Sequence, residues 1–255
     1  KALSHLEYVL ERPNNAFTEQ ALSAAATVYH EDGELDKAVE AYQRLEKMAE
    51  VHANLIKART GMMRIYHQRE QHGKAIETAD KVLHTEKVNS REKREANYIK
   101  GISLFHQEEY DRALKTFRLI ADEVNSEEGA EAKFRIAQIL YEKEDYKVAE
   151  NEIFDFVQQN SSQEYWKARS FILLAEVYRA MEDNFQAKHT LKSIIDNYEP
   201  LSEKDSIIDM AKETYNDIVE EEKYEMKKDS TDQEMKIQFE KSSEIANPAD
   251  TTQQN

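Results

Sequence analysis

The chain has 255 residues, of which 40% are hydrophobic and 34% charged, so it holds enough apolar side chains for a sizeable core. Five glycines and three prolines are few for this length, which favours helices over strands joined by tight turns. A net charge of −16 argues against binding to nucleic acid or to an anionic membrane surface, and the absence of cysteine excludes disulfides and cysteine-ligated zinc.

The first segment of the chain has the spacing of the second helix of a helical hairpin, with Ala2, Leu6 and Val9 on one face. We therefore expect residues 1–12 to be half of a repeat. Because the chain opens with lysine and in the middle of a unit, we expect it to be a fragment of a longer protein whose leader and earlier repeats are missing.

Repeated units follow this half-repeat. An alanine recurs at intervals of 37, 38, 36 and 38 residues, and each of these alanines lies nine residues after an apolar residue such as Tyr29 or Leu104. Such self-similarity indicates a stack of repeats. The recurring alanines are Ala38, Ala75, Ala113, Ala149 and Ala187. The predicted repeats span about 16–50, 54–88, 92–125, 129–160 and 165–200.

Each repeat has the pattern of two helices joined by a short polar turn. In the third repeat, apolar spacing predicts a first helix over 95–107 and a second over 111–124. Glycine in mid-helix costs roughly 1 kcal/mol relative to alanine, so we interpret Gly101 as a position where the two helices approach closely. In the second repeat Met63 occupies this site and Gly61 lies two positions away, so we expect a local distortion there.

These positions resemble those of the tetratricopeptide repeat (TPR). The small and aromatic residues, the turns HEDGELDKA and EKEDYKVA, and the alanine of the second helix match that family over about residues 2–200. The resemblance implies an all-α fold: a right-handed α-solenoid of about five helical hairpins, with a leading half-repeat and a C-terminal capping helix. The period of 36–38 residues is longer than the usual 34. This longer form resembles the repeats of bacterial periplasmic and outer-membrane-associated scaffold proteins.

A different pattern follows Pro200. Residues 201–225 predict a helix with Ser202 at its N-cap and a polar outer face, as expected of a helix that covers the open end of a repeat stack.

The last segment, residues 226–255, is a polar acidic tail that composition alone would assign to disorder. Within it, Met235, Ile237 and Phe239 alternate with polar residues as in a strand. We therefore expect this segment to dock as an extended peptide, in a groove of its own molecule or of a neighbouring one.

No arrangement typical of an enzyme is present. The sequence lacks an HExxH run, a glycine-rich phosphate loop and a GxSxG motif. Acidic pairs such as Glu108–Glu109 fall in turns, where solvated side chains are expected. We therefore predict no catalytic residue, no cofactor and no metal site.

The histidines give a weaker pattern. His67 and His72 are five residues apart, which places them about 140° apart around a helix, and so they do not share a face. His30, His67 and His106 fall on successive first helices about 10 Å apart, too far to share one metal ion. Either the inner face is mildly pH-sensitive, or these are surface histidines without a special role.

The inner surface of the stack, where this family usually binds its ligands, is the predicted site. On adjacent first helices, aromatic residues form a stripe distinct from the core stripe, and arginines could frame it. The candidate protein- or peptide-binding residues are Arg64, His67, Tyr98, Ile102, Phe105, Phe134, Arg135, Gln138, Tyr141 and Arg169. The alternative is that these aromatics only fill space between neighbouring helices. Trp166 is expected either to be buried between repeats or to offer an exposed contact.

The resulting prediction is a non-enzymatic scaffold that holds another protein or an extended peptide, basic or neutral, in its concave face. One alternative is a structural spacer without a ligand groove. Another is an enzyme whose catalytic domain lies in a missing N-terminal part. Self-association through the tail or through the open N-terminal end is a further expectation. The subfamily resemblance suggests the periplasm or outer membrane, with the cytoplasm as the alternative.

Overall fold

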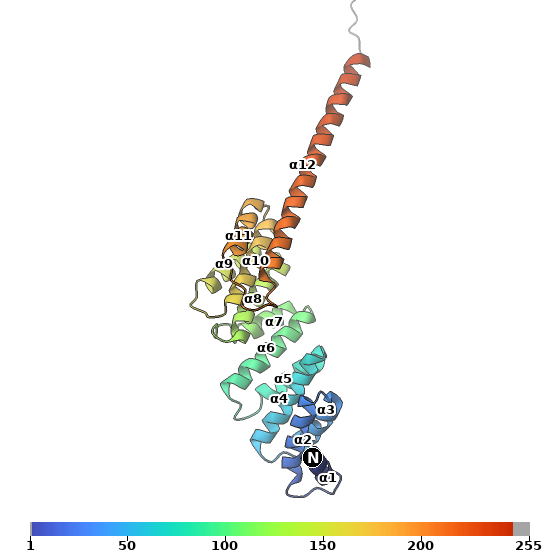
Figure 1. Ribbon diagram of the computed structural model, residues 1–255, viewed down its shortest axis with the longest axis vertical. Helices are drawn as coiled ribbons and strands as arrows, with labels where there is room; N and C mark the ends of the chain where they lie inside the picture. The colour runs from blue at the N-terminus through green and yellow to red at the C-terminus, as the bar shows by residue number, and fades with distance from the viewer. Residues whose placement is uncertain (1, 247–255) are drawn as a thin grey trace, which may run out of the picture. The chain divides into compact units, whose positions relative to one another are not determined.

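The computed structural model describes residues 2–246, and every regular element within that range is a helix (Figure 1). The chain is an all-α solenoid, as the sequence predicts. It divides into two compact units, residues 1–170 and residues 171–255, which are described separately below. None of the helices described combines the length and the apolar character that a membrane crossing requires.

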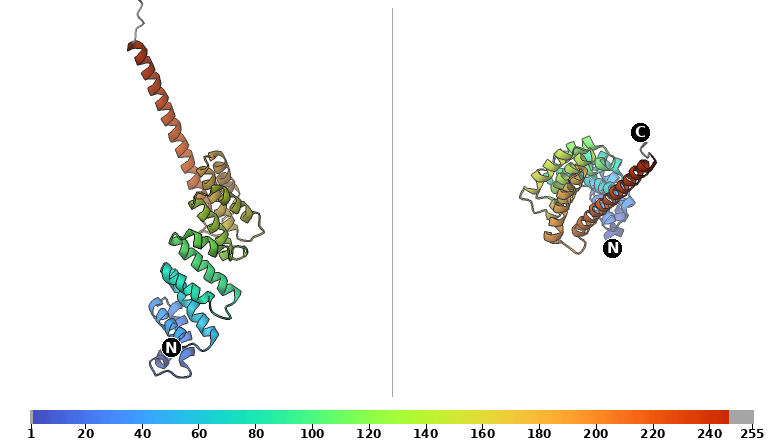
Figure 2. Two further views of the ribbon diagram at one scale, coloured as in Figure 1. Left: turned by 180° about the vertical axis from the view of Figure 1, so that it is seen from behind. Right: turned by 90° about the horizontal axis from the view of Figure 1, so that it is seen from above.

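The first unit is built from successive helical hairpins. Its helices are α1 (Ala2–Leu10), α2 (Thr18–Glu31), α3 (Leu35–Met48), α4 (His52–Gln68), α5 (His72–Leu83), α6 (Ser90–His106), α7 (Tyr110–Phe117), α8 (Glu127–Glu142) and α9 (Tyr146–Val157), and α10 (Glu164–Ala180) begins in it. The first helices of the hairpins, α2, α4, α6 and α8, pack on one another in that order (Figure 2, left). Helices α3, α5 and α7 each pack against their own first helix and against that of the next hairpin, and α9 packs against α8. The first helices therefore share one face of the unit.

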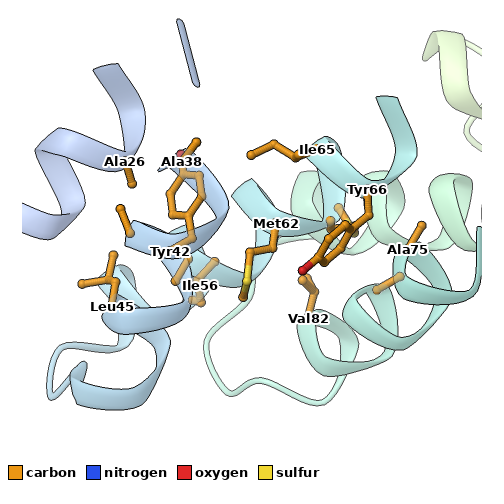
Figure 3. Close-up of a cluster of buried hydrophobic side chains, with 14 of the residues drawn as sticks. Ala26, Ala38, Tyr42, Leu45, Ile56, Met62, Ile65, Tyr66, Ala75 and Val82 are labelled. Atoms are coloured by element: carbon orange, nitrogen blue, oxygen red, sulfur yellow. The ribbon is translucent and has the colours of Figure 1, made fainter. Parts of the chain in front are cut away.

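The recurring alanines lie in the core, as predicted. Ala38, Ala75, Ala113 and Ala149 are completely buried. Figure 3 shows Ala38 and Ala75 within one apolar cluster that draws side chains from successive hairpins. A methyl group at these positions lets the helices of a hairpin pack closely.

A glycine and a large side chain are matched where the two helices of the third hairpin meet. In the third hairpin a Cβ added to Gly101 would lie 2.6 Å from the Phe117 ring, so the ring occupies the space that glycine leaves. This confirms the interpretation of Gly101 as a contact position. Residues at the corresponding sites of the other hairpins of this unit, all buried, are Ala26 with Tyr42, Met63 with Ala79, and Ala137 with Ile153. In the second hairpin the larger residue, Met63, stands on the first helix and the smaller, Ala79, on the second.

The distortion expected at Gly61 is absent, because α4 is a continuous helix from His52 to Gln68. Gly61 instead receives the ring of Tyr42 from the preceding hairpin, which leaves no room for a Cβ at that position. The glycine is explained by an aromatic side chain that reaches across from α3, a contact that the repeat pattern does not reveal.

The turn inside each hairpin has the same backbone conformation. The second-to-last residue before the second helix adopts a positive φ, which favours glycine, yet four of the five residues are glutamates. These residues are Gly33, Glu70, Glu108, Glu144 and Glu182. The amide N–H of the next residue then donates to the carbonyl of the apolar residue that precedes each alanine by nine, as in Glu109 N–H to the Leu104 oxygen at 3.0 Å. This is the hydrogen bond of a helix C-cap, and it explains why the spacing between the apolar residue and the alanine is constant.

We expect Glu108→Gly to raise the free energy of unfolding by about 0.5–1 kcal/mol. A side chain in the left-handed region costs roughly 1–2 kcal/mol in the folded state. Glycine removes this cost, but it also stabilises the unfolded chain through its greater conformational freedom, so the net gain is smaller. The reciprocal Gly33→Glu should lower stability by a similar amount. Urea denaturation followed by circular dichroism measures both changes, and two shifts of the same sign would contradict the explanation.

The second helix of the third repeat is shorter than predicted. It was expected over 111–124, but α7 ends at Phe117, and the chain continues in tight turns with hydrogen bonds such as Ile120 N–H to the Phe117 oxygen at 3.0 Å. The hydroxyl of Ser161 donates to the Val124 carbonyl at 2.5 Å and so holds the end of this segment. This hydrogen bond joins residues 37 positions apart, a contact that the local helical pattern does not encode.

The second unit contains the end of α10, α11 (Asn184–Asn197) and α12 (Ile207–Ala246), and α12 packs against α11. Ser202 does not cap α12. Instead the side chain of Asp205 accepts a hydrogen bond from the amide of Ile207 at 3.0 Å. Ile207, Ala211 and Ile218 are fully buried, whereas the described side chains beyond residue 222 are exposed.

The extended segment expected around residues 235–239 is wrong, because α12 continues through it to Ala246. Residues 223–246 contain no glycine or proline and many lysines and glutamates, so intrinsic helix propensity outweighs the alternation of three apolar residues. Residues 247–255 of the predicted tail lie outside the described range, and the predicted division into repeats, cap and tail stays a prediction.

Candidate protein-binding groove

A chain of polar contacts links the first helices α6 and α8. The phenol of Tyr98 on α6 donates to Oε2 of Glu131 on α8 at 2.7 Å. Arg135, one turn further along α8, donates from Nη2 to Oε1 of the same carboxylate at 2.8 Å and from Nη1 to Oε1 of Gln138 at 2.9 Å. Burial, together with the charge of Glu131, raises the pKa of Tyr98, so this phenol stays protonated and acts as a donor. Glu131 is only 6% exposed, and its three hydrogen bonds satisfy its charge.

Aromatic rings surround the Arg135 guanidinium. Its central carbon lies 5.3 Å from the centre of the Phe105 ring and 5.5 Å from that of Phe134. Arg169 lies over Phe134 at 5.1 Å, and Trp166 contacts Phe134 with ring centres 5.5 Å apart. Trp166 is buried, so the structure favours the first of the two roles expected for it. Cation–π contacts of this kind stabilise the arginine positions.

A groove of about 530 Å³ lies beside this network, over α4, α6 and the start of α8. It is lined by Arg64, His67, Arg91, Glu95, Tyr98, Ile99, Glu127 and Glu128. Three of the predicted site residues, Arg64, His67 and Tyr98, lie here. His67 and Tyr98 meet edge to face with ring centres 6.3 Å apart. Burial lowers the pKa of His67, which favours the neutral imidazole.

The other predicted residues lie elsewhere. Ile102 and Phe134 are buried, with 5% and 4% of their surface exposed. Phe105 and Tyr141 are half-buried near the turns of their hairpins, where they contact Tyr110 and Tyr146 with ring centres 5.8 and 5.7 Å apart. Arg135 and Gln138 belong to the network around Glu131, and Arg169 to the cluster around Phe134.

Five groove residues were missed in the sequence. Arg91 and Glu95 precede Tyr98 by seven and three positions, so helical periodicity places them on the same face of α6 and could have found them. Glu127 and Glu128 begin α8, where acidic side chains have an ordinary role at a helix N-terminus, and this obscured them.

The groove carries both charges, and most of them are paired. Arg64 binds Glu95 with two hydrogen bonds, of which the Nη2–Oε2 bond is 2.7 Å, and this pairing raises the pKa of Arg64. Glu128 lies 3.3 Å from Arg94. Within residues 2–246, Arg91 and Glu127 form no ion pair, so a cationic and an anionic side chain face the groove without an internal partner. No cluster of three or more histidine, aspartate and glutamate side chains in the same range could hold a metal ion.

Two family models described as tetratricopeptide repeat match the chain, at residues 64–127 and 169–199. The first match covers α5, α6 and α7 together with the end of α4 and the first residue of α8, and so includes most of the groove residues. The chain is a TPR protein.

Solved structures agree with this assignment of the TPR fold. YrrB, described as a TPR protein with an unusual peptide-binding site, is 19% identical, with 84% of this chain and 98% of that chain covered and a TM-score of 0.57. MamA is 17% identical, with 74% and 100% covered and a TM-score of 0.56. A TPR protein from Parabacteroides merdae is 17% identical, with 86% and 83% covered and a TM-score of 0.54. Identities this low show the fold alone. A comparison with curated proteins found no match.

Proposed function

We propose that this TPR protein is a non-enzymatic scaffold that binds an extended segment of another protein in the groove over α4, α6 and α8. The observation that carries the proposal is the pair Arg91 and Glu127, which face the groove without an ion-pair partner in the described part of the chain. A charged side chain without an internal partner only has to give up water when it binds a ligand, whereas a paired one must also break its ion pair.

The shape and chemistry of the groove suit a peptide. The rings of Tyr98 and His67, with Ile99, offer an apolar and aromatic surface for one side chain of a ligand. Arg91 can meet a carboxylate or a backbone carbonyl, and Glu127 a basic group or a backbone amide. The net charge of −16 favours a basic or neutral partner overall.

Two further observations support binding over a purely structural spacer. A spacer has no need of a groove of about 530 Å³ that carries uncompensated charges. YrrB, which shares the fold, is described as having a peptide-binding site. The periplasmic or outer-membrane location is supported only by the long repeat period and stays a prediction.

Peptides selected from a random library against the full chain at pH 7.5 test this proposal. We expect the double charge exchange Arg91→Glu/Glu127→Lys to weaken their binding at least about tenfold, which corresponds to about 1.4 kcal/mol. The matched control, Lys115→Glu/Asp122→Lys, exchanges two exposed charges away from the groove and should leave the dissociation constant unchanged. Equal affinity of both variants, measured by calorimetry, would refute this site.

A further inference from the structure

Three histidines from three successive helices gather at one end of the groove. His67 lies in the last turn of α4, His72 is the first residue of α5 and His106 is the last residue of α6. The rings of His72 and His106 are stacked, with centres 4.9 Å apart and planes 13° apart. In the sequence, helical geometry separated His67 from His72, and Gly73 suggested that His72 lies in the turn. The turn at Glu70 lies between them and brings His72 back towards α4.

The third and fourth repeats hold uncharged aromatic pairs at the corresponding positions, whereas the first holds His30 with Leu35 and the fifth Arg179 with Asn184. His67 and His72 align with Phe105 and Tyr110 of the third repeat, and these align in turn with Tyr141 and Tyr146. The ring centres of those two pairs lie 5.8 and 5.7 Å apart. The second repeat therefore has two imidazoles at a packing site where the third and fourth repeats have phenylalanine and tyrosine.

The surroundings are poorly suited to a charged imidazole. The Nδ1 atoms of His67 and His72 are buried and have no hydrogen-bond partner among the described residues. A protonated imidazole carries an N–H group on both nitrogens and a full positive charge. Here the Nδ1 N–H would lack an acceptor and the charge would lack a partner. Gln71, next to His72, and Ser103, three residues before His106, each have a buried side-chain oxygen without a hydrogen-bond partner among the described residues. Both oxygens are neutral and do not compensate a charge.

The charged groups around the cluster do not offset this cost. Glu95 of α6 is already bound by Arg64, and Glu131 of α8 by Tyr98 and Arg135. Glu70, which follows α4, is exposed, and Arg135 adds a positive charge beside His106.

The pKa directions agree with this account. Burial and then His72 lower the pKa of His67, although Glu131 and Glu95 act in the opposite direction. Burial, His72 and Arg135 lower the pKa of His106 against the effect of Glu70.

We infer that His67 and His106, packed together with His72, form a proton-sensitive joint between the second and third repeats, which orders the groove wall at neutral pH and loosens it in mildly acidic solution. Because His67 also lines the groove and contacts Tyr98, loosening of the joint should weaken ligand binding, and this consequence rests on the proposed function.

The sign follows from linkage. A histidine whose pKa is lower in the folded state binds fewer protons folded than unfolded. Stability therefore falls as the pH drops through the unfolded value of about 6.5 towards the lowered folded value.

Hydrogen exchange of the ligand-free protein at pH 7.5 and pH 5.5, corrected for intrinsic exchange rates, tests the joint. In the wild type we expect protection of α5 and α6 amides to drop about tenfold at pH 5.5. In His67→Phe/His72→Tyr/His106→Gln the drop should disappear, because the three imidazoles are gone. The substitutes are residues that stand at the corresponding positions of other repeats, so the packing should be kept. His84→Gln, which removes an exposed histidine, should behave like the wild type.

Unchanged protection in the wild type, or an equal drop in the triple variant, would overturn the joint. Should the triple variant not fold, His106→Gln alone removes one of the two stacked rings. A pH effect in that variant as large as in the wild type would refute the inference. A groove peptide should bind the wild type more weakly at pH 5.5 than at pH 7.5, and the triple variant equally at both. Failure to bind any peptide at pH 7.5 would refute the proposed function while leaving the exchange result intact.

Discussion

Replacing Phe117 with alanine is expected to lower the free energy of unfolding by about 3–5 kcal/mol, the range typical of phenylalanine truncation in a core. The ring is completely buried, and it lies against Gly101, which has no side chain to move into the space. Because each repeat contacts only its neighbours, the loss should appear first as faster hydrogen exchange in α6 and α7. Urea denaturation measures the total effect.

A second substitution distinguishes matched packing from simple loss of a large side chain. The second repeat holds Met63 and Ala79 where the third holds Gly101 and Phe117. Gly101→Met alone should destabilise the protein by about 1–3 kcal/mol, because the new side chain would overlap the Phe117 ring. Gly101→Met/Phe117→Ala should be more stable than Phe117→Ala alone by at least about 1 kcal/mol. Additive effects of the two changes would contradict the matched pair.

The control for this series is Leu119→Ala. Leu119 lies two residues after Phe117, yet 70% of it is exposed. Its truncation should change stability by no more than about 0.5 kcal/mol. A larger loss would mean that the segment after α7, and not the Phe117 ring, carries the effect.

Glu131→Ala is the change with the second-largest expected cost, about 2–3 kcal/mol. It removes three hydrogen bonds at once and leaves the phenol of Tyr98 and the guanidinium of Arg135 without their anionic partner. Arg135 keeps its hydrogen bond to Gln138, and its side chain is 20% exposed to solvent. The loss should therefore be smaller than for a fully buried ion pair. Urea denaturation again provides the measurement.

A double-mutant cycle isolates the contribution of the network. Tyr98→Phe should cost about 1 kcal/mol in the wild type and close to nothing in Glu131→Ala, since its hydrogen bond is already lost there. Glu77→Ala serves as the surface control, because Glu77 and Lys81 form an exposed pair at 3.0 Å. Its cost should stay below about 0.5 kcal/mol. Equal losses in Glu77→Ala and Glu131→Ala would show that burial of the network contributes nothing.

Local pattern was sufficient for the repeats. The alanines from Ala38 to Ala187 mark the hairpins because each lies at a fixed distance from a turn of one conformation. Where local pattern failed, a distant residue was the cause. The segment that follows α7 is held at Val124 by Ser161, and the Tyr42 ring of the preceding hairpin leaves room only for glycine at position 61. The long continuation of α12 is the exception, since its own helix propensity could have predicted it.

The groove was only partly predictable. The stripe of the first helices placed Arg64, His67 and Tyr98 on one surface, but it treated buried and exposed aromatics alike. Burial of Phe134 depends on Trp166 and Arg169 from α10, and a pattern within one helix carries no information on what covers it.

The amino-acid sequence by itself determined the hairpins, their number and the side of each helix that faces the core, because these depend on spacings of three, four and about 37 residues along one chain. Only the tertiary structure decided which charges are cancelled, with Glu95 bound by Arg64 and Arg91 left open to the groove. It also decided that His72 stacks on His106. Such partners lie about 30 residues apart and meet through the rotation of one hairpin on the next, which no spacing within a single repeat encodes.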